Sequence, residues 1–145
     1  MDDLFSKQAS SLYGAIWDAM KKGAPLTGDA EMISAAMTAH PEFDPFWGLG
    51  EVAFYPQEVN GCIVNPLVHV GLHVAIEKQL ERGEPEEVRA TLASLLESGV
   101  DRHEAIHKIA AIWGDLYFRS VRRGDPFEEW VYIQALSTLT PNGKE

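Results

Sequence analysis

Residues 65–82 read NPLVHVGLHVAIEKQLER, and this stretch decides the fold. Asn65 followed by Pro66 is typical of a helix start, because asparagine caps the first turn and proline fits its first position. The residues that follow are apolar almost all round, and Gly83 ends the run. A helix that is apolar on every side is normally buried. We therefore expect a central, buried helix over residues 66–82, with the rest of the chain packed around it.

Proline and glycine divide the remaining sequence into further segments in which apolar residues recur at helical spacing. The expected helices cover residues 3–22, 30–39, 85–98, 101–123 and 125–139. Residues 41–64 lack a regular pattern, and no strand-like alternation is evident anywhere in the chain. The sequence thus predicts an all-α single domain over residues 1–145. It is a bundle of five to six helices, with a long irregular loop between the second helix and the central helix.

Composition restricts the function. The net charge is −10, so the surface repels phosphate backbones, and neither nucleic acid nor an anionic membrane is an expected partner. No apolar run reaches the roughly 18 residues of a membrane-spanning helix, and the first residues do not resemble a signal peptide. Cys62 is the only cysteine, which fits a reducing compartment. We expect a cytoplasmic protein.

Four of the five histidines form two pairs with the same spacing, His69–His73 and His103–His107. Counting all pairs of histidines, chance would place two of them at this spacing in roughly one sequence in a hundred. Residues four apart lie on one face of a helix. Both pairs also fall on the apolar stripes of their predicted helices. Two such helices packed face to face could direct four imidazoles at one point.

Neutral imidazole is the commonest metal ligand and suits zinc, copper, iron and nickel. We expect one divalent transition metal, zinc first, with iron or nickel as alternatives. Glu77 is the best additional ligand, because it lies one turn beyond His73; Glu104 and Asp115 are weaker candidates. Four histidines would close a structural site, whereas three with a water would leave an open, hydrolytic one. His40 precedes a proline at a helix end and is interpreted as a capping residue, with the alternative that the long loop folds it toward the other histidines.

Two other interpretations use the same residues. Buried histidines can be hydrogen-bonded core residues with no metal, although four rings then need partners in an apolar setting. Residues 103–107 also match the H-E-x-x-H pattern of zinc peptidases, in which the glutamate is a general base. That five-residue pattern has two free positions, and Glu104 already has a sufficient role in capping the helix after Asp101.

Residues 41–64 contain the aromatic residues Phe43, Phe46, Trp47, Phe54 and Tyr55. A loop of this length is usually functional or packed by its own side chains. We favour an aromatic cover over the open side of a helical core. The alternative is a metal-free interaction domain, which would use the acidic surface and the aromatic loop at Phe43–Trp47 to bind a protein partner. A homo-oligomer is also compatible with the sequence.

Three stretches together resemble a small bacterial family known only as a domain of unknown function (number eighteen-forty-one). They are Pro25-Leu26-Thr27 with His40-Pro41-Glu42-Phe43, residues 65–79, and His103-Glu104-Ala105-Ile106-His107 in a helix ending Arg122-Arg123-Gly124. The resemblance implies a helical, cytoplasmic protein and brings no activity. It points to His69, His73, His103 and His107 as the functional centre. The family pattern has an acid directly before the last histidine, where this chain has Ile106, so a carried-over acid role is in doubt.

Overall fold

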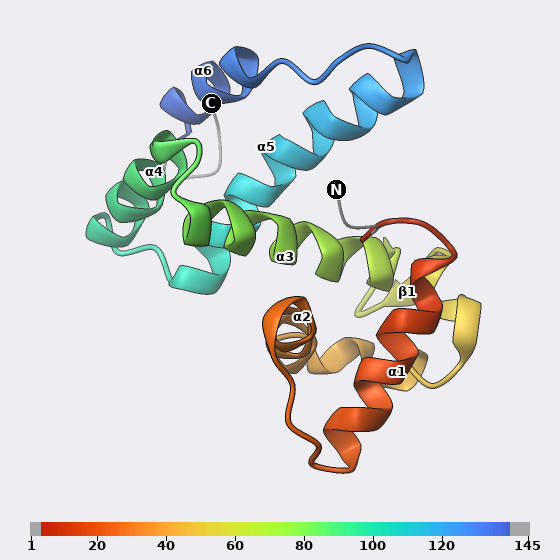
Figure 1. Cartoon of the computed structure of the whole chain (residues 1–145). Coiled ribbons are helices and arrows are strands. Elements are labelled where there is room, and N and C mark those ends of the chain that lie inside the picture. Colours follow the sequence, from red (N-terminus) through yellow and green to blue (C-terminus); the bar gives the residue numbers. More distant parts are fainter. Residues whose placement is uncertain (1–3, 140–145) are drawn as a thin grey trace. The chain divides into compact units, whose positions relative to one another are not determined.

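The computed structural model describes residues 4–139, and its regular structure is mainly helical, as the sequence predicts (Figure 1). Within this range there are six α-helices, two 3-10 helices and one two-stranded sheet. The elements are α1 (Ala9–Lys21), α2 (Gly28–Thr38), η1 (Pro41–Phe46), η2 (Gly50–Phe54), β1 (Gln57–Val59), β2 (Cys62–Val64), α3 (Pro66–Arg82), α4 (Glu86–Glu97), α5 (Arg102–Arg123) and α6 (Glu129–Ser137). None of these helices is long and apolar enough to cross a membrane.

The chain forms two compact units, an N-terminal unit (Met1–Val74) and a C-terminal unit (Ala75–Glu145). Helix α3 begins in the first unit and ends in the second. Each unit has buried apolar residues of its own. The expectation of one domain over the whole chain stays a prediction.

The N-terminal unit is built from α1, α2, the two 3-10 helices, the small sheet and the first half of α3. Helix α1 packs against α2 and η2, and α2 packs against η1. Tyr13 on α1 is completely buried, stacks on Trp47 and donates a hydrogen bond to the carbonyl oxygen of Leu4. The core of this unit consists of Leu4, Ala9, Tyr13, Ile16, Ile33, Ala36, Met37, Phe43, Trp47, Ala53, Leu67, Val70 and Val74.

Residues 41–64 are more regular than the sequence indicates. They hold η1, η2 and an antiparallel hairpin in which Val59 pairs with Cys62. Asn60 and Gly61 form its turn, both with positive φ, as an Asn-Gly hairpin turn requires. The expectation that the chain has no strand is therefore wrong. Strands of three residues are too short to show alternation, and the Asn-Gly pair was the available signal.

The aromatic side chains of this segment largely cover the core. Phe43 and Trp47 are 2% and 1% exposed, and Phe46 is half-buried. Phe43 and Trp47 are in edge-to-face contact. Burial of these two side chains agrees with the core-cover interpretation and leaves the Phe43–Trp47 loop little apolar surface to offer a partner.

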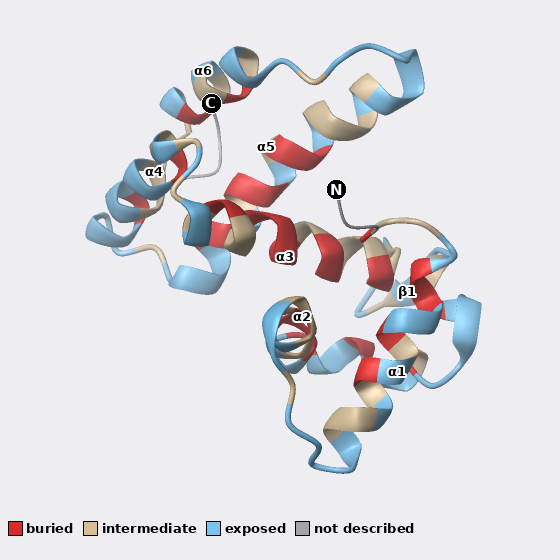
Figure 2. Ribbon diagram, in the orientation of Figure 1, coloured by how far each residue is buried: buried red, intermediate tan, exposed pale blue. Residues whose placement is uncertain are grey.

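Helix α3 begins and ends at the residues expected from the sequence. The side-chain oxygen of Asn65 accepts a hydrogen bond from the backbone N–H of Val68 at 3.1 Å, which is the predicted cap. Figure 2 shows buried residues along much of the helix. At Gly71, helix α3 lies very close to the segment that contains Leu4 and Phe5. A Cβ added at Gly71 would lie 2.7 Å from the carbonyl oxygen of Leu4 and 2.9 Å from the ring of Phe5.

The C-terminal unit contains the second half of α3 and helices α4, α5 and α6, and the last three pack against one another. Asp101 caps α5 by accepting a hydrogen bond from the backbone N–H of Glu104, and Gly124 ends the helix in the left-handed conformation. The buried residues include Ile76, Val88, Leu95, Ile106, Ile109, Trp113, Tyr132 and Leu136.

Two helices are shorter than expected. Helix α1 begins at Ala9, so residues 4–8 are outside it, and Asp3 lies outside the described residues. Helix α6 begins at Glu129 rather than directly after Asp125-Pro126. Helix ends are set by backbone caps and packing, which hydrophobic spacing does not determine.

A hydrogen bond inside the C-terminal unit joins two helices that are far apart in sequence. The Tyr132 hydroxyl of α6 donates to the side-chain oxygen of Gln79 on α3 at 2.6 Å, and both residues are buried. Burial, together with the negative charge of Glu129, raises the pKa of Tyr132. The neutral hydroxyl is therefore the form that the folded unit retains.

Replacing Gly71 by alanine should destabilise the N-terminal unit, because the new methyl group collides with the backbone of Leu4. Forced overpacking of this kind costs about 1–3 kcal/mol. Gly48→Ala is a matched control in the same unit, since an added Cβ there meets nothing within 4 Å. Denaturant unfolding would measure both, and equal midpoints for the two variants would contradict the close approach.

Replacing Tyr132 by phenylalanine should cost about 1–3 kcal/mol at neutral pH, because Gln79 loses its buried partner. The pKa of Tyr132 is higher in the folded state than in the unfolded chain, where it is about 10. The contribution of Tyr132 to stability is therefore complete below pH of about 10, and it is lost as the pH rises above that value. The difference in unfolding free energy between wild type and Y132F should then shrink by up to about 1.4 kcal/mol per pH unit. Tyr55→Phe, at an exposed position, is the control; a difference that stays constant through alkaline pH would refute this account.

Candidate metal centre

Three histidine rings lie together inside the N-terminal unit, and they come from two elements. His69 and His73 are on successive turns of α3, with ring centroids 5.0 Å apart. The ring of His40 is 4.8 Å from that of His69 and 4.5 Å from that of His73, and it meets both edge-on. The three centroids form a nearly equilateral triangle. We refer to His40, His69 and His73 as the histidine triad.

His40 reaches the triad because α2 ends directly before it. Its backbone N–H donates to the carbonyl oxygen of Met37, and its own carbonyl oxygen accepts from Phe43 as η1 begins. Pro41 cannot continue an α-helix from His40, since proline disfavours helical geometry in the residue before it. The backbone of His40 is thus fixed by hydrogen bonds on both sides.

The Nδ1 atom of His40 lies 2.7 Å from the carbonyl oxygen of Ala36. A carbonyl oxygen only accepts hydrogen bonds, so Nδ1 must carry the proton. In the neutral ring, Nε2 then carries the lone pair. Metal-binding histidines commonly donate their second ring nitrogen to a backbone carbonyl or carboxylate in this way, which fixes the tautomer and the ring orientation.

The other two rings are positioned by the start of α3. The Asn65 side chain also donates to the carbonyl oxygen of Phe54, so the cap ties the helix start to the end of η2. The backbone N–H of His69 donates to the carbonyl oxygen of Asn65 at 2.9 Å. His73 and His40 are 5% and 1% exposed, whereas His69 is half-buried.

The ring separations of the triad can be compared with those of three imidazoles bound to one ion. Zinc binds imidazole nitrogen at about 2.0–2.1 Å in tetrahedral geometry, which would place ring centroids about 5 Å apart. The observed separations of 4.5, 4.8 and 5.0 Å agree with this value.

The surroundings of the triad are apolar on one side. Phe43 is stacked parallel to His40 at 5.5 Å and meets His69 edge-on at 5.4 Å. Over residues 4–139, the ligand-type side chains that gather closely enough to share an ion are all histidines. An all-nitrogen donor set favours zinc, copper, nickel or iron over magnesium, calcium or manganese.

Glu77, the predicted carboxylate ligand, is engaged elsewhere. Its two carboxylate oxygens accept hydrogen bonds from Arg102 at 2.7 and 3.1 Å, within the C-terminal unit. This bond and the charge of Glu77 raise the pKa of Arg102, against the opposing effect of partial burial. The bidentate pair links α3 to the start of α5.

The second predicted pair, His103 and His107, is in the C-terminal unit, and both side chains are exposed. The prediction that they lie on the buried stripe of α5 is therefore wrong. That stripe consists of Ala105, Ile106, Ile109, Ala110, Trp113 and Gly114. Helical spacing shows which residues share a face of α5, but it does not show how deeply each of them is buried.

The remaining acidic candidates have other partners. Glu104 supplies the backbone N–H for the Asp101 cap, and its carboxylate lies 3.7 Å from Lys108. Asp115 accepts a hydrogen bond from Arg119 at 2.6 Å. Within the described residues, the hairpin of the N-terminal unit is the only sheet, so the H-E-x-x-H segment has no strand beside it in its own unit.

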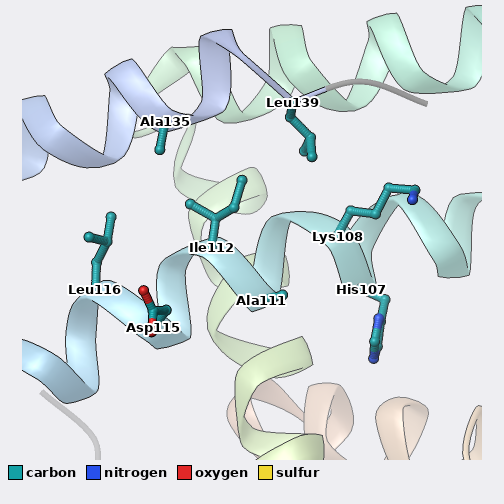
Figure 3. A pocket seen from close by; sticks show the side chains of 8 residues that line it. All are labelled: His107, Lys108, Ala111, Ile112, Asp115, Leu116, Ala135 and Leu139. Atoms are coloured by element: carbon teal, nitrogen blue, oxygen red, sulfur yellow. The ribbon is translucent and has the colours of Figure 1, made fainter. Parts of the chain in front are cut away.

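A groove of about 420 Å³ lies between α5 and α6 in the C-terminal unit, lined by His107, Lys108, Ala111, Ile112, Asp115, Leu116, Ala135 and Leu139. Figure 3 shows Ile112 and Leu139 pointing toward each other across it, whereas His107 points away from α6. The groove is mainly apolar, and His107 lies at its edge.

His40 is interpreted from the sequence as a capping residue, and the alternative that the long loop brings it to the other histidines is the one that agrees with the triad. It has no histidine partner at helical spacing, so spacing does not rank it as a ligand. The available signal was its place directly before Pro41 and an aromatic segment, where the chain must turn back over the core.

The sequence model of a family described as "Domain of unknown function (DUF1841)" matches residues 6–138. No curated protein and no solved structure matches.

Proposed function

The chain belongs to the DUF1841 family, and we propose that its N-terminal unit binds one divalent transition metal ion through the histidine triad. The observation that carries this proposal is the meeting of three imidazole rings within 4.5–5.0 Å of one another. The hydrogen bond from His40 to Ala36 adds the orientation that a metal-binding histidine requires. Zinc is the metal that we propose first, with iron and nickel as alternatives.

The proposed role of the ion is first of all structural. His40 follows α2 and the other two ligands are on α3, so an ion would connect elements that are otherwise joined through a long segment, residues 41–64. Because the unfolded chain does not hold the three rings together, binding free energy becomes folding free energy. A hydrolytic role would require an open coordination position in addition.

Several expectations from the sequence remain proposals. Metal binding by His103 and His107, the second predicted pair, is one of them, whereas the Glu77 carboxylate is held by Arg102. A cytoplasmic location and a protein partner or homo-oligomer are likewise retained as proposals. Phe43 and Trp47 are buried, so the interaction alternative would rely on the acidic surface.

Full-length protein purified without chelator or nickel resin should contain about one metal ion per chain by elemental analysis, and chelation should lower its melting temperature. At free zinc about a hundredfold above Kd, the ion would contribute about 2.7 kcal/mol. Acidification should release it, because protons compete for the imidazole nitrogens. Absence of metal, with no thermal response to added zinc, iron or nickel, would refute the proposal.

His69→Ala and His73→Ala should lose the ion and the response of the melting temperature to zinc. His69 is half-buried, so H69A is the variant better placed to fold without its ligand. Ile33→Val is a matched control, since it perturbs the same core by about 0.5–1.5 kcal/mol and leaves every ligand in place. Normal metal content in H69A or H73A, or metal loss in I33V, would contradict the assignment.

Glu77→Gln should retain the ion, because the Glu77 carboxylate is held by Arg102. Its stability should fall by less than about 1 kcal/mol, as is usual for an accessible ion pair. His103→Ala with His107→Ala, made together, tests the second pair by the same elemental analysis. Metal loss in E77Q would restore Glu77 as a ligand, and metal loss in the double variant would confirm the prediction from spacing.

A further inference from the structure

The β1–β2 hairpin leaves the main chain of Ile63 without a neighbouring strand on one side. Facing residues of an antiparallel pair alternate between pairs that exchange two hydrogen bonds and pairs that exchange none. The two-residue turn makes Val59 and Cys62, which flank it, a bonded pair. The next pair, Glu58 and Ile63, is therefore not bonded, and the N–H and C=O groups of Ile63 point away from β1. Among the described residues the sheet has only these two strands, so no third strand takes up those groups.

The side chain of Ile63 is also open to solvent. It is 72% exposed, more than any other large apolar side chain in the described part of the chain. Val59 and Val64 pack against the core of the N-terminal unit, so the hairpin is held in place. Edge strands are normally protected from further pairing by charged side chains, proline or a bulge. Residues 61–65 contain neither a charged residue nor a proline, and the register of β1 with β2 is regular.

The charge distribution indicates which edge of the hairpin a second copy of the chain can approach. Residues 1–74 contain three Lys or Arg against nine Asp or Glu, a net charge of −6, so two copies repel each other over most of this unit. Between Glu58 and Glu77 the sequence has no Lys, Arg, Asp or Glu, and β2 lies in this stretch. Pairing through the outer edge of β1 would instead bring the Glu58 residues of both copies face to face, and like charges directly opposite are destabilising.

We propose that two copies of the chain associate through β2, with the two strands antiparallel and a twofold axis at Ile63. In this register Ile63 of one copy faces Ile63 of the other, and their outward N–H and C=O groups exchange two hydrogen bonds. The result is a four-stranded sheet with the two isoleucine side chains side by side at its centre. Twofold dimers are the commonest protein oligomers. One short strand per copy is a small interface, so we expect a weak dimer. This inference does not need a bound metal ion.

Analytical ultracentrifugation of the full-length protein over a range of concentrations tests the association. We expect a monomer–dimer equilibrium, with more dimer at higher NaCl because salt screens the repulsion between two acidic copies. Ile63→Lys should abolish the dimer and leave the circular dichroism spectrum unchanged, since the replaced side chain is exposed. Val121→Lys, at an exposed apolar position of the C-terminal unit, is the matched control. Mixing I63K with Ile63→Glu should restore a dimer, because opposite charges then face each other.

Disulfide trapping tests the register. In a Cys62→Ser background, Ile63→Cys places two cysteines in a bonded pair with Cα atoms about 5.5 Å apart, which is within the range of a disulfide. Cys62 itself is exposed, so its replacement should be tolerated. Oxidation should therefore give a covalent dimer. Glu58→Cys in the same background is the control, because its two cysteines would lie three strand spacings apart, about 14 Å.

A protein that is monomeric at every concentration and salt level overturns the proposal. A dimer that I63K leaves intact also overturns it, since another surface then forms the contact. Covalent dimers from Glu58→Cys but not from Ile63→Cys would show that the copies pair through β1 instead. A dimer that I63K abolishes, V121K retains and Ile63→Cys traps supports the pairing of β2 with β2.

Discussion

The hydrogen bond from His40 Nδ1 to the Ala36 carbonyl oxygen is the interaction on which the candidate site depends. It is made across the last turn of α2, where helical carbonyl groups lack intrahelical partners. It therefore satisfies a group left by the end of the helix, and it also fixes the ring. Pro41 favours that helix end, because it disfavours helical geometry at His40. The turn that ends α2 and the orientation of His40 thus have the same cause.

Helix α3 supplies the other half of the site, and its sequence explains why two polar rings are tolerated there. Leu67, Val70 and Val74 bury its apolar side in the core of the N-terminal unit. His69 and His73 are on the side that meets His40. Burying polar rings is unfavourable unless their nitrogens are satisfied. One ion coordinated by the three rings would satisfy a nitrogen of each at once.

The sequence predicted the parts of this structure that depend on local signals. The ends of α3 were predicted from Asn65-Pro66 and Gly83, and those of α5 from Asp101 and Gly124. Such caps act within a few residues of a helix end, so they can be recognised locally. The regular structure of segment 41–64 was not predicted. Trp47 stacks on Tyr13 and Phe43 contacts His69, and contacts with residues so distant in sequence leave no local signal.

The candidate site was predicted to the extent that it lies on one helix. The spacing of His69 and His73 identified two of the three histidines. Residues on successive turns of a helix share a face, and this does not depend on the rest of the fold. His40 depends on where α2 ends and how the chain turns, which spacing cannot show. The exposure of His103 and His107 depends on what packs against α5, and a helical stripe does not encode that.

The acidic surface and the histidine donors act on cations in different ways. The net charge of −6 over residues 1–74 raises the local concentration of every cation, including magnesium and calcium. It therefore cannot select one. The nitrogen donors must therefore select the ion. The affinity of divalent ions for such donors rises from manganese to copper and is lower again for zinc. Since copper would bind such a set most tightly, the ion found in the cell is determined by metal availability as much as by the protein. The geometry sets a further limit. A His40 ring oriented by the Ala36 carbonyl favours an ion without a strong geometric preference, and zinc has that property.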